Sequence, residues 1–267
     1  MKQNHQRRIS LFGMMIDRVR LDGAARRVLR WAREEPSEAG CRYVVTPNVD
    51  HAVMFQTNES LRASYDDAAL VVADGAPLIA ASRLLGKPLP ERVAGSDLAP
   101  KLFEAATAGA EQGARKLRLF LLGAGPGVAE RAAVRVERDW PGVEVVGTHC
   151  PPLGFENDDR QNQQALAAIA DAHADVVLIG LGAPKQELWV HRYHDQIQAK
   201  VALCAGATID FLAGEKRRSP RWMQRVGLEW AHRLLSEPKR LARRYARDAW
   251  VFPQLVWAEI RGAQGGV

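Results

Sequence analysis

Six short apolar runs between residues 42 and 207 constrain the fold of this 267-residue chain more than any other feature. A strand with one solvated face would alternate apolar with polar residues, but these runs are almost continuously apolar. Each is therefore expected to be a strand buried on both faces. Segments with helical patterning separate the runs, which is typical of a parallel sheet covered by helices. The runs are RYVV, ALVV, KLRLFLL, VEVV, ADVVLIG and AKVALC.

We therefore predict an α/β fold, with a Rossmann-like, doubly wound, mainly parallel sheet and helices on both faces. Residues 1–213 would form this core, with a soft boundary between two lobes near residues 113–116. Residues 214–267 would form a basic helical appendage. The expected helices span residues 75–86, 97–112, 127–139, 158–173 and 184–198 in the core, then 221–236 and 239–259, separated by Pro238.

The positive charge of the chain is concentrated in the appendage. Residues 214–250 hold eleven Lys and Arg against four Asp and Glu, a net charge of +7, whereas the whole chain carries +6. This segment is therefore expected to meet an anionic partner. Tryptophan and tyrosine are interleaved with the basic residues, which suits the surface of an anionic bilayer. Nucleic acid, or a solvated helical face with buried tryptophans, is the alternative explanation.

The sequence disfavours several classes of protein. No run approaches the roughly 18 to 20 apolar residues of a membrane-spanning helix, and the basic N-terminus lacks the apolar stretch of a secretory signal. Cys41, Cys150 and Cys204 are odd in number and far apart, so we expect neither disulfides nor a zinc site. The chain is thus expected to be cytoplasmic and associated peripherally with the inner face of the cell membrane.

Ligands of open parallel sheets bind beyond the carboxyl ends of the strands, so the residues that follow the apolar runs form the candidate site. Asp74 follows the second run and precedes Gly75, and its carboxylate could accept a proton as a general base. Capping of the helix that begins near Ala76 is its alternative role. The other candidates at these strand ends are Thr46, Asn48, Gly123, Gly125, Gly182 and Gln186.

The turn from Gly123 to Gly127 could hold a diphosphate, because glycines let backbone amides approach an anion at a helix N-terminus. A simple tight turn explains it equally well. Its spacing departs from GxGxxG, and the next strand ends in Gly147, Thr148 and His149 without an acidic residue for a ribose. These residues disfavour an NAD-dependent oxidoreductase, which stays an alternative. No DxD pair or metal-ligand spacing is present, so we expect no cofactor and no required metal.

Six segments, in this order, resemble the WecG/TagA/CpsF family, which is glycosyltransferase family 26. The resemblance extends from about residue 10 to residue 250. It implies an inverting glycosyltransferase that moves N-acetylmannosamine, its uronic acid or glucose from a UDP-sugar to a polyprenyl-diphosphate-linked acceptor in cell-surface or exopolysaccharide biosynthesis. The segments are TPNVDH, ADGAPL, RVAGSDL, GLGAPKQELW, AGATIDFLAGEKRRSPRWMQ and GLEWAHRLLSEPKRLARRY.

The resemblance also implies roles for individual residues. Asp74 matches the proposed catalytic base, and Thr46 and Asn48 match polar residues near the acceptor or the sugar. Gln186 matches a residue that contacts the donor region. The expected reaction is a single displacement, in which Asp74 takes the proton of an acceptor hydroxyl while UDP departs from the opposite face.

In the same family the appendage is associated with membrane docking and with completion of the active site. Arg221 and Arg233 lie in this segment, and Arg221 or its neighbours would meet the charge that develops on the diphosphate. The expected partners are the UDP-sugar, the lipid-linked acceptor and an anionic membrane surface, with no nucleic acid; a homo-oligomer is left open. A non-enzymatic module that binds anionic surfaces or nucleic acid is the remaining alternative, although it leaves the polar strand ends unused.

Overall fold

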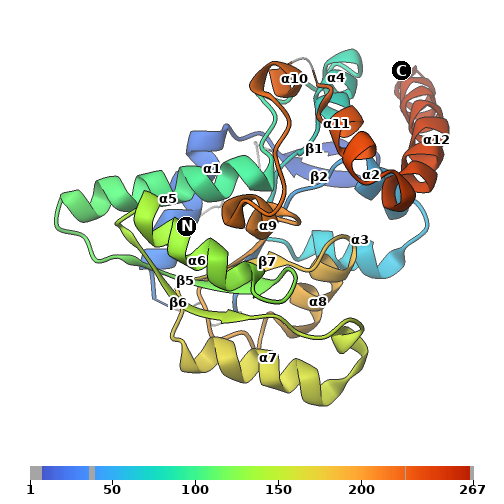
Figure 1. The fold of residues 1–267 in the computed structure, drawn as a ribbon. Coiled ribbons are helices and arrows are strands. Elements are labelled where there is room, and N and C mark those ends of the chain that lie inside the picture. Colours follow the sequence, from blue (N-terminus) through green and yellow to red (C-terminus); the bar gives the residue numbers. More distant parts are fainter. Residues whose placement is uncertain (1–7, 36–39, 226, 265–267) are drawn as a thin grey trace.

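Six parallel strands form one sheet. The computed structural model describes residues 8–35, 40–225 and 227–264. The sheet has the order β4-β3-β8-β7-β5-β6, and every neighbouring pair is parallel (Figure 1). The strands lie where the apolar runs predict them: β3 (Arg42–Val45), β4 (Leu70–Val71), β5 (Leu117–Gly123), β6 (Val143–His149), β7 (Val176–Gly180) and β8 (Val201–Cys204).

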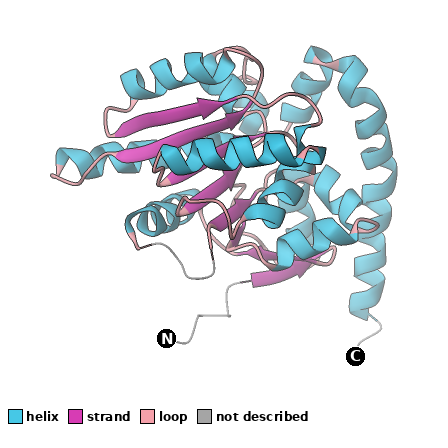
Figure 2. Ribbon diagram, turned by 90° about the horizontal axis from the view of Figure 1, so that it is seen from below, coloured by secondary structure: helices cyan, strands magenta, loops and turns pink. Residues whose placement is uncertain are grey.

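Helices cover both faces of this sheet, as Figure 2 shows from a second direction. Successive side chains of a strand point to opposite faces, so Tyr43 and Val45 enter one hydrophobic core while Val44 enters the other. Two buried faces explain why the runs are continuously apolar, and the predicted fold class is confirmed. One core takes α2 (Val49–Phe55), α3 (Glu59–Asp66), α4 (Ala76–Leu84), α7 (Asp159–Asp171) and α8 (Lys185–Tyr193); the other takes α1 (Leu21–Arg33), α5 (Gly95–Glu111), α6 (Val128–Asp139) and α9 (Thr208–Ala213).

An antiparallel hairpin precedes the sheet, and the sequence pattern did not predict it. Its strands are β1 (Arg8–Leu11) and β2 (Met14–Asp17). The carboxylate of Asp17 accepts a hydrogen bond from the backbone N–H of Val71 at 3.0 Å. This bond satisfies a donor on the short edge strand β4, which would otherwise present it to solvent or to another chain.

The prediction of one helix over residues 221–236 is wrong. The structure has α10 (Arg221–Arg225) and α11 (Glu229–Ser236) in this segment. Gly227 lies between them with a φ of 78°, in the left-handed region where a helix ends. A short 3-10 turn, η2 (Phe155–Asn157), follows β6.

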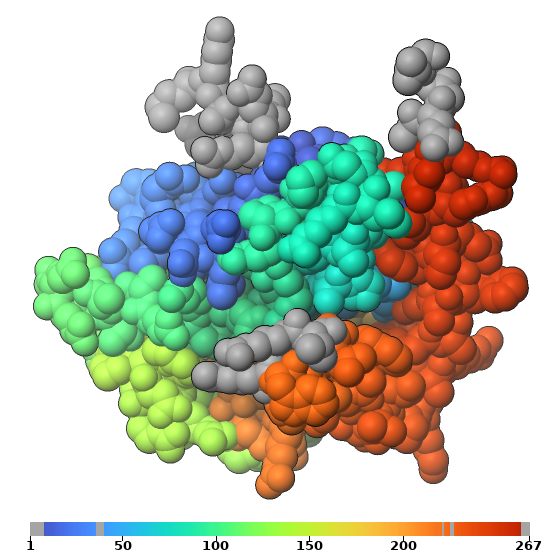
Figure 3. All heavy atoms as spheres, turned by 90° about the horizontal axis from the view of Figure 1, so that it is seen from above, coloured from blue at the N-terminus to red at the C-terminus, as the bar shows by residue number. Residues whose placement is uncertain are grey.

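The last helix, α12 (Pro238–Gln264), begins at the predicted break and forms one side of the molecule (Figure 3). The ring of Phe252 packs edge-on against Phe12 in the hairpin turn, with centroids 5.2 Å apart. Glu259 accepts a hydrogen bond from the N–H of Phe12 at 2.7 Å. Across residues 8–35, 40–225 and 227–264, no helix combines the length and apolar character needed to cross a bilayer. The division of the chain into a core and an appendage stays a prediction.

Candidate active site

Asn48 and Asp74 lie side by side at the carboxyl ends of β3 and β4. Asn48 is the N-cap of α2, and its side-chain oxygen accepts a hydrogen bond from the N–H of His51 at 3.4 Å. Gly75 follows Asp74, and a Cβ added to it would lie 3.7 Å from the Cβ of Asn48. Gly75 has a φ of 137°, a conformation that L side chains rarely adopt, so the backbone turns sharply after Asp74.

Asp74 does not cap a helix. Gly75 is the N-cap residue of α4, and no side-chain hydrogen bond caps this end. The carboxylate is 30% exposed, and the nearest cation among the described side chains is Arg92, whose Nη1 lies 3.7 Å from Oδ1. Burial raises the pKa of the Asp74 carboxyl to about 6, although Arg92 favours its charged form. A carboxyl with such a pKa can exist as a base near neutral pH and still hold a proton that it receives.

A cluster of four further charged residues lies beside Asp74 and joins the core to the C-terminal segment. Arg92 donates to Glu229 of α11 at 2.9 Å and to Asp97 of α5 at 2.8 Å. Arg218 donates to the other oxygen of Asp97 at 2.6 Å, and its Nε lies 3.7 Å from Glu229. These contacts hold Arg218 and Glu229 of the C-terminal segment against Arg92 and Asp97 of the core.

The basic residues of the appendage differ in how they relate to Asp74. Arg233 of α11 lies close enough for its charge to lower the pKa of the Asp74 carboxyl, as Arg92 also does. Within the described residues, the Nε and Nη2 atoms of Arg218 are buried without a hydrogen-bond partner. Arg221 begins α10, and its side chain lies outside the described residues.

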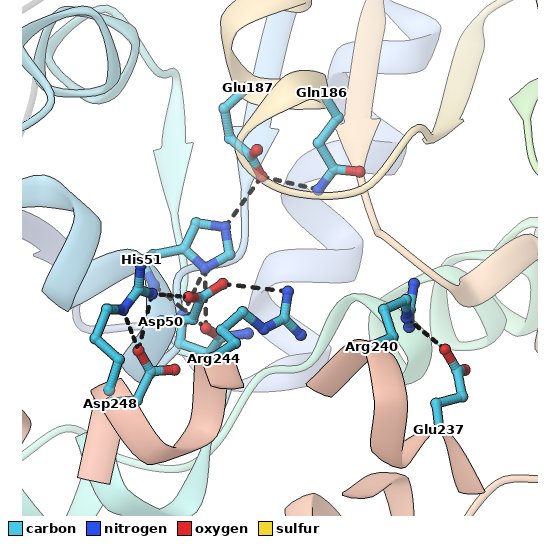
Figure 4. Close-up of polar contacts among 10 residues, drawn as sticks. Asp50, His51, Gln186, Glu187, Glu237, Arg240, Arg244 and Asp248 are labelled. Atoms are coloured by element: carbon cyan, nitrogen blue, oxygen red, sulfur yellow. Dashed lines mark hydrogen bonds and ion pairs between the residues drawn. The ribbon is translucent and has the colours of Figure 1, made fainter. Parts of the chain in front are cut away.

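Thr46 and Gln186 are buried, and their side chains bond to the protein itself. The Thr46 hydroxyl donates to the backbone oxygen of Cys204 at 3.1 Å. Gln186 accepts from the N–H of Gly206 at 3.1 Å. It also donates to Glu187 at 2.8 Å (Figure 4). Both residues therefore link neighbouring strand ends of the sheet, and their contacts with substrate stay predictions.

The three predicted glycines have different local surroundings. Gly123 has a φ of 105°, and a Cβ there would lie 2.8 Å from the backbone of Gly180, so the packing of β5 against β7 requires glycine. Gly125 would place a Cβ 3.5 Å from Val128, which is ordinary contact. Gly182 has a φ of 79° and faces open space. The structure thus explains Gly123 by packing, and a role of these turns in binding a diphosphate stays a prediction.

The charged cluster was missed because its members lie far apart in the sequence. Arg218 and Asp97 are separated by 121 positions, and Arg92 and Glu229 by 137. One signal was present, since Arg92 and Asp97 belong to the segment RVAGSDL that carries part of the family resemblance.

Comparison with known proteins identifies the family of this chain. A family model described as "Glycosyl transferase WecG/TagA/CpsF family" matches residues 9–265. A relative from Bacillus spizizenii (strain W23), named N-acetylglucosaminyldiphosphoundecaprenol N-acetyl-beta-D-mannosaminyltransferase, is 33% identical over 201 residues, which cover 75% of this chain and 74% of the relative. Proteins of the same name from Staphylococcus aureus strains MRSA252 and MW2 are each 27% identical over 201 residues, with the same coverage. The expected resemblance is confirmed: the chain belongs to the WecG/TagA/CpsF family of glycosyltransferases.

Proposed function

We propose that this protein transfers a sugar from a UDP-sugar to a saccharide linked to polyprenyl diphosphate, with inversion at the anomeric carbon. The observation that carries the proposal is Asp74, whose carboxylate lies at the end of β4, caps no helix and has a pKa raised to about 6. The curated relatives are named for transfer of N-acetylmannosamine to N-acetylglucosaminyl-diphosphoundecaprenol. We propose an acceptor of this kind, with N-acetylmannosamine, its uronic acid or glucose as the donor sugar.

In the proposed reaction Asp74 acts as the general base. Its carboxylate takes the proton from an acceptor hydroxyl while that oxygen forms the new bond to the anomeric carbon. The bond from the anomeric carbon to the UDP oxygen breaks on the opposite face, and UDP leaves with the electron pair. One displacement inverts the configuration and needs a single carboxylate as its base, and Asp74 is proposed for this role.

Cationic side chains near Asp74 are proposed to balance the charge of the departing diphosphate. Arg218 is a candidate because two of its buried nitrogens have no hydrogen-bond partner within the described residues. Arg233 is a second candidate, since its charge already acts on Asp74, and Arg221 is retained from the family resemblance. Preorganised donors of this kind stabilise developing negative charge. We propose that no metal is required.

We also propose that the C-terminal helices rest on an anionic membrane surface. Large apolar side chains are exposed on α10, α11 and α12, in a segment that carries a net charge of +7. Exposed indoles and cationic residues together suit the headgroup region of a bilayer. Binding to liposomes that contain anionic lipid, weakened by salt, would support this proposal. The exposed residues include Trp222, Trp230, Leu235, Trp250 and Trp257.

The test is a transfer assay with a panel of UDP-sugars and a short-chain polyprenyl-diphosphate saccharide, run with and without EDTA. The proposal expects one UDP-sugar to transfer, EDTA to have no effect, and the product linkage to be inverted. The Asp74→Asn variant should fold normally and lose transfer. If no UDP-sugar transfers to any lipid-linked acceptor, or the product retains configuration, the proposed reaction is wrong.

A further inference from the structure

We propose that Asp50, His51 and Glu187 are positioning residues that couple the seating of α12 to the placement of Asn48 and Gln186 in the candidate site. This inference rests on the proposed function for its kinetic test. Its structural test needs no activity. Figure 4 shows the contacts of Asp50, His51, Glu187 and Gln186. With the bond from Gly206 to Gln186, they run from the last helix through α2 to the residues that follow β3, β7 and β8.

The first link joins α12 to α2. Asp50 has only 7% of its side chain exposed, and its carboxylate forms ion pairs with two arginines of α12. Arg247 donates to Oδ1, and Nη1 of Arg244 lies 3.4 Å from Oδ2. Arg247 also donates to Asp248 on its own helix at 2.9 Å. A buried carboxylate that loses such partners is strongly disfavoured, so Asp50 fixes where α12 rests.

The second link joins α2 to α8 through His51, the residue after Asp50. His51 is buried, and its Nε2 lies 3.3 Å from Oε1 of Glu187. Its Nδ1 lies 3.3 Å from the backbone nitrogen of Asn48 and 3.0 Å from the side-chain oxygen of Asn48. A proton on Nε2 satisfies the contact to Glu187, while Nδ1 accepts the backbone N–H of Asn48 when unprotonated and donates to the side-chain oxygen of Asn48 when protonated. His51 thus fixes the cap residue of α2 and the carboxylate of α8 together.

The third link reaches the loop after β8. Glu187 is fully buried, and its Oε1 accepts the side-chain N–H of Gln186 at 2.8 Å. Gln186 in turn accepts the backbone N–H of Gly206 at 3.1 Å. The chain of contacts that begins at Asp50 therefore ends at Gly206, which has a φ of 55° and open space where a side chain would project.

The geometry of α2 makes these links act together. Asn48, Asp50 and His51 belong to one turn at the start of a helix of seven residues. The capping contacts between His51 and Asn48 tie this turn together, so a shift of Asp50 toward or away from α12 also moves Asn48, which lies against Gly75. When α12 is not seated, fewer molecules hold Asn48 and Gln186 in the arrangement that the reaction needs, and the apparent affinity for substrate falls in proportion.

The structural test uses amide hydrogen exchange of the full-length protein without substrate. Asp50→Asn and Arg247→Gln should each speed exchange in residues 238–264 and also in residues 185–206. Arg243→Gln is the matched control, because Arg243 is exposed on the same helix. This substitution removes one positive charge, as Arg247→Gln does, and should leave exchange in both segments unchanged. Coupling is reciprocal, so Glu187→Gln should speed exchange in residues 238–264. If Asp50→Asn loosens α12 and leaves residues 185–206 unchanged, the coupling does not exist.

The kinetic test uses the short-chain acceptor without membranes, so that membrane affinity does not enter. Asp50→Asn should raise KM by about tenfold with a smaller change in kcat, and Asp50→Glu should restore most of the loss because it keeps the two ion pairs. The double variant of Asp50→Asn with Glu187→Gln should lose less than the product of the single losses, since both act on one network. Multiplicative losses would overturn the proposal. If the wild-type protein transfers no sugar, the proposed function fails while the exchange result still decides the coupling.

Discussion

Two carboxylates, one at the amino ends of the strands and one at their carboxyl ends, differ in how many partners the protein gives them. Asp175 precedes β7 at the amino edge and is 4% exposed. Both of its oxygens accept hydrogen bonds from Arg115, one of them accepts the N–H of Arg118 at 3.0 Å, and Lys200 lies 3.6 Å away. Among the described side chains, by contrast, none donates a hydrogen bond to the carboxylate of Asp74 at the carboxyl edge, and the closest cation is 3.7 Å away.

This difference suits Asp175 to stabilising the fold and Asp74 to a role in the proposed reaction. A carboxylate whose two oxygens both accept hydrogen bonds from the protein holds the chain together and has little capacity left for a substrate. A carboxylate that burial partly deprives of water, without replacing that water by donors, costs the fold some stability and is free to accept a proton. Four predictions test this contrast, from the largest expected effect to the smallest.

The largest effect is expected on turnover. Asp74→Asn removes the base and keeps the shape, so kcat should fall about 1,000-fold, within the range for general bases. Single-turnover transfer with the matched lipid-linked acceptor measures the loss. Asp66→Asn, on the exposed surface of α3, is the control and should retain wild-type turnover. Turnover of Asp74→Asn within tenfold of wild type would exclude Asp74 as the base.

The next effect is expected on stability. Asp175→Ala leaves Arg115 and Lys200 without their shared partner, so the free energy of unfolding should fall by about 2 to 3 kcal/mol. Denaturant unfolding measures this change, and Arg115→Gln should cost less because half of the Arg115 side chain is exposed. Transfer per folded molecule should stay unchanged in both variants. A loss of turnover without a loss of stability would contradict the assignment of Asp175 to the fold.

A third effect should appear in the pH profile. With a pKa of about 6 for the Asp74 carboxyl, kcat/KM should be constant above neutral pH and roughly tenfold lower at pH 5, where the base is mostly protonated. Arg92 favours the charged form of Asp74. Arg92→Gln should therefore move the acid limb to higher pH, and an acid limb that stays in place would show that another group titrates.

The smallest effect concerns the stability that Asp74 costs. Its pKa is higher in the folded chain than the ordinary value of 3.8, so the folded state binds more protons and stability falls as pH rises from about 4 to about 6. Asp74→Asn should thus stabilise the protein by about 1 kcal/mol at pH 8 and by much less at pH 4. Equal effects at both pH values would mean that the charge of Asp74 is not the cause.

The sheet and the location of Asp74 could be predicted from local sequence. Burial on both faces forces apolar residues at successive positions, which marks all six strands, and the residue after such a run must lie at the carboxyl edge. The same reasoning placed Asn48 beside Asp74, and it placed Gln186 after β7, which lies three positions from β4 in the sheet. It could not show that the Gln186 side chain is held by Gly206 and Glu187, because hydrogen bonds between strand ends leave no periodic signal.

The missed elements are short or depend on distant partners. The hairpin strands have four residues each, too few for a pattern to stand out. The pair of Arg247 with Asp50 spans 197 positions and depends on how α12 lies against α2. Gly227 was read as part of a helix, although its left-handed backbone divides that segment in two. Such features follow from tertiary packing, which overrides local propensity.

The position of β8 has a consequence for the newly made chain. Although β8 is the last strand to be synthesised, it pairs with β3 on one side and with β7 on the other. Until residues 201–204 have left the ribosome, the sheet exists as two separate parts. One part holds β3 and β4, the other holds β5, β6 and β7, and each has an open edge where β8 will pair. Pairing across such long sequence separations is slow. The protein is therefore most exposed to aggregation before β8 joins the two partial sheets, and chaperones that shield strand edges matter most until residues 201–204 have paired.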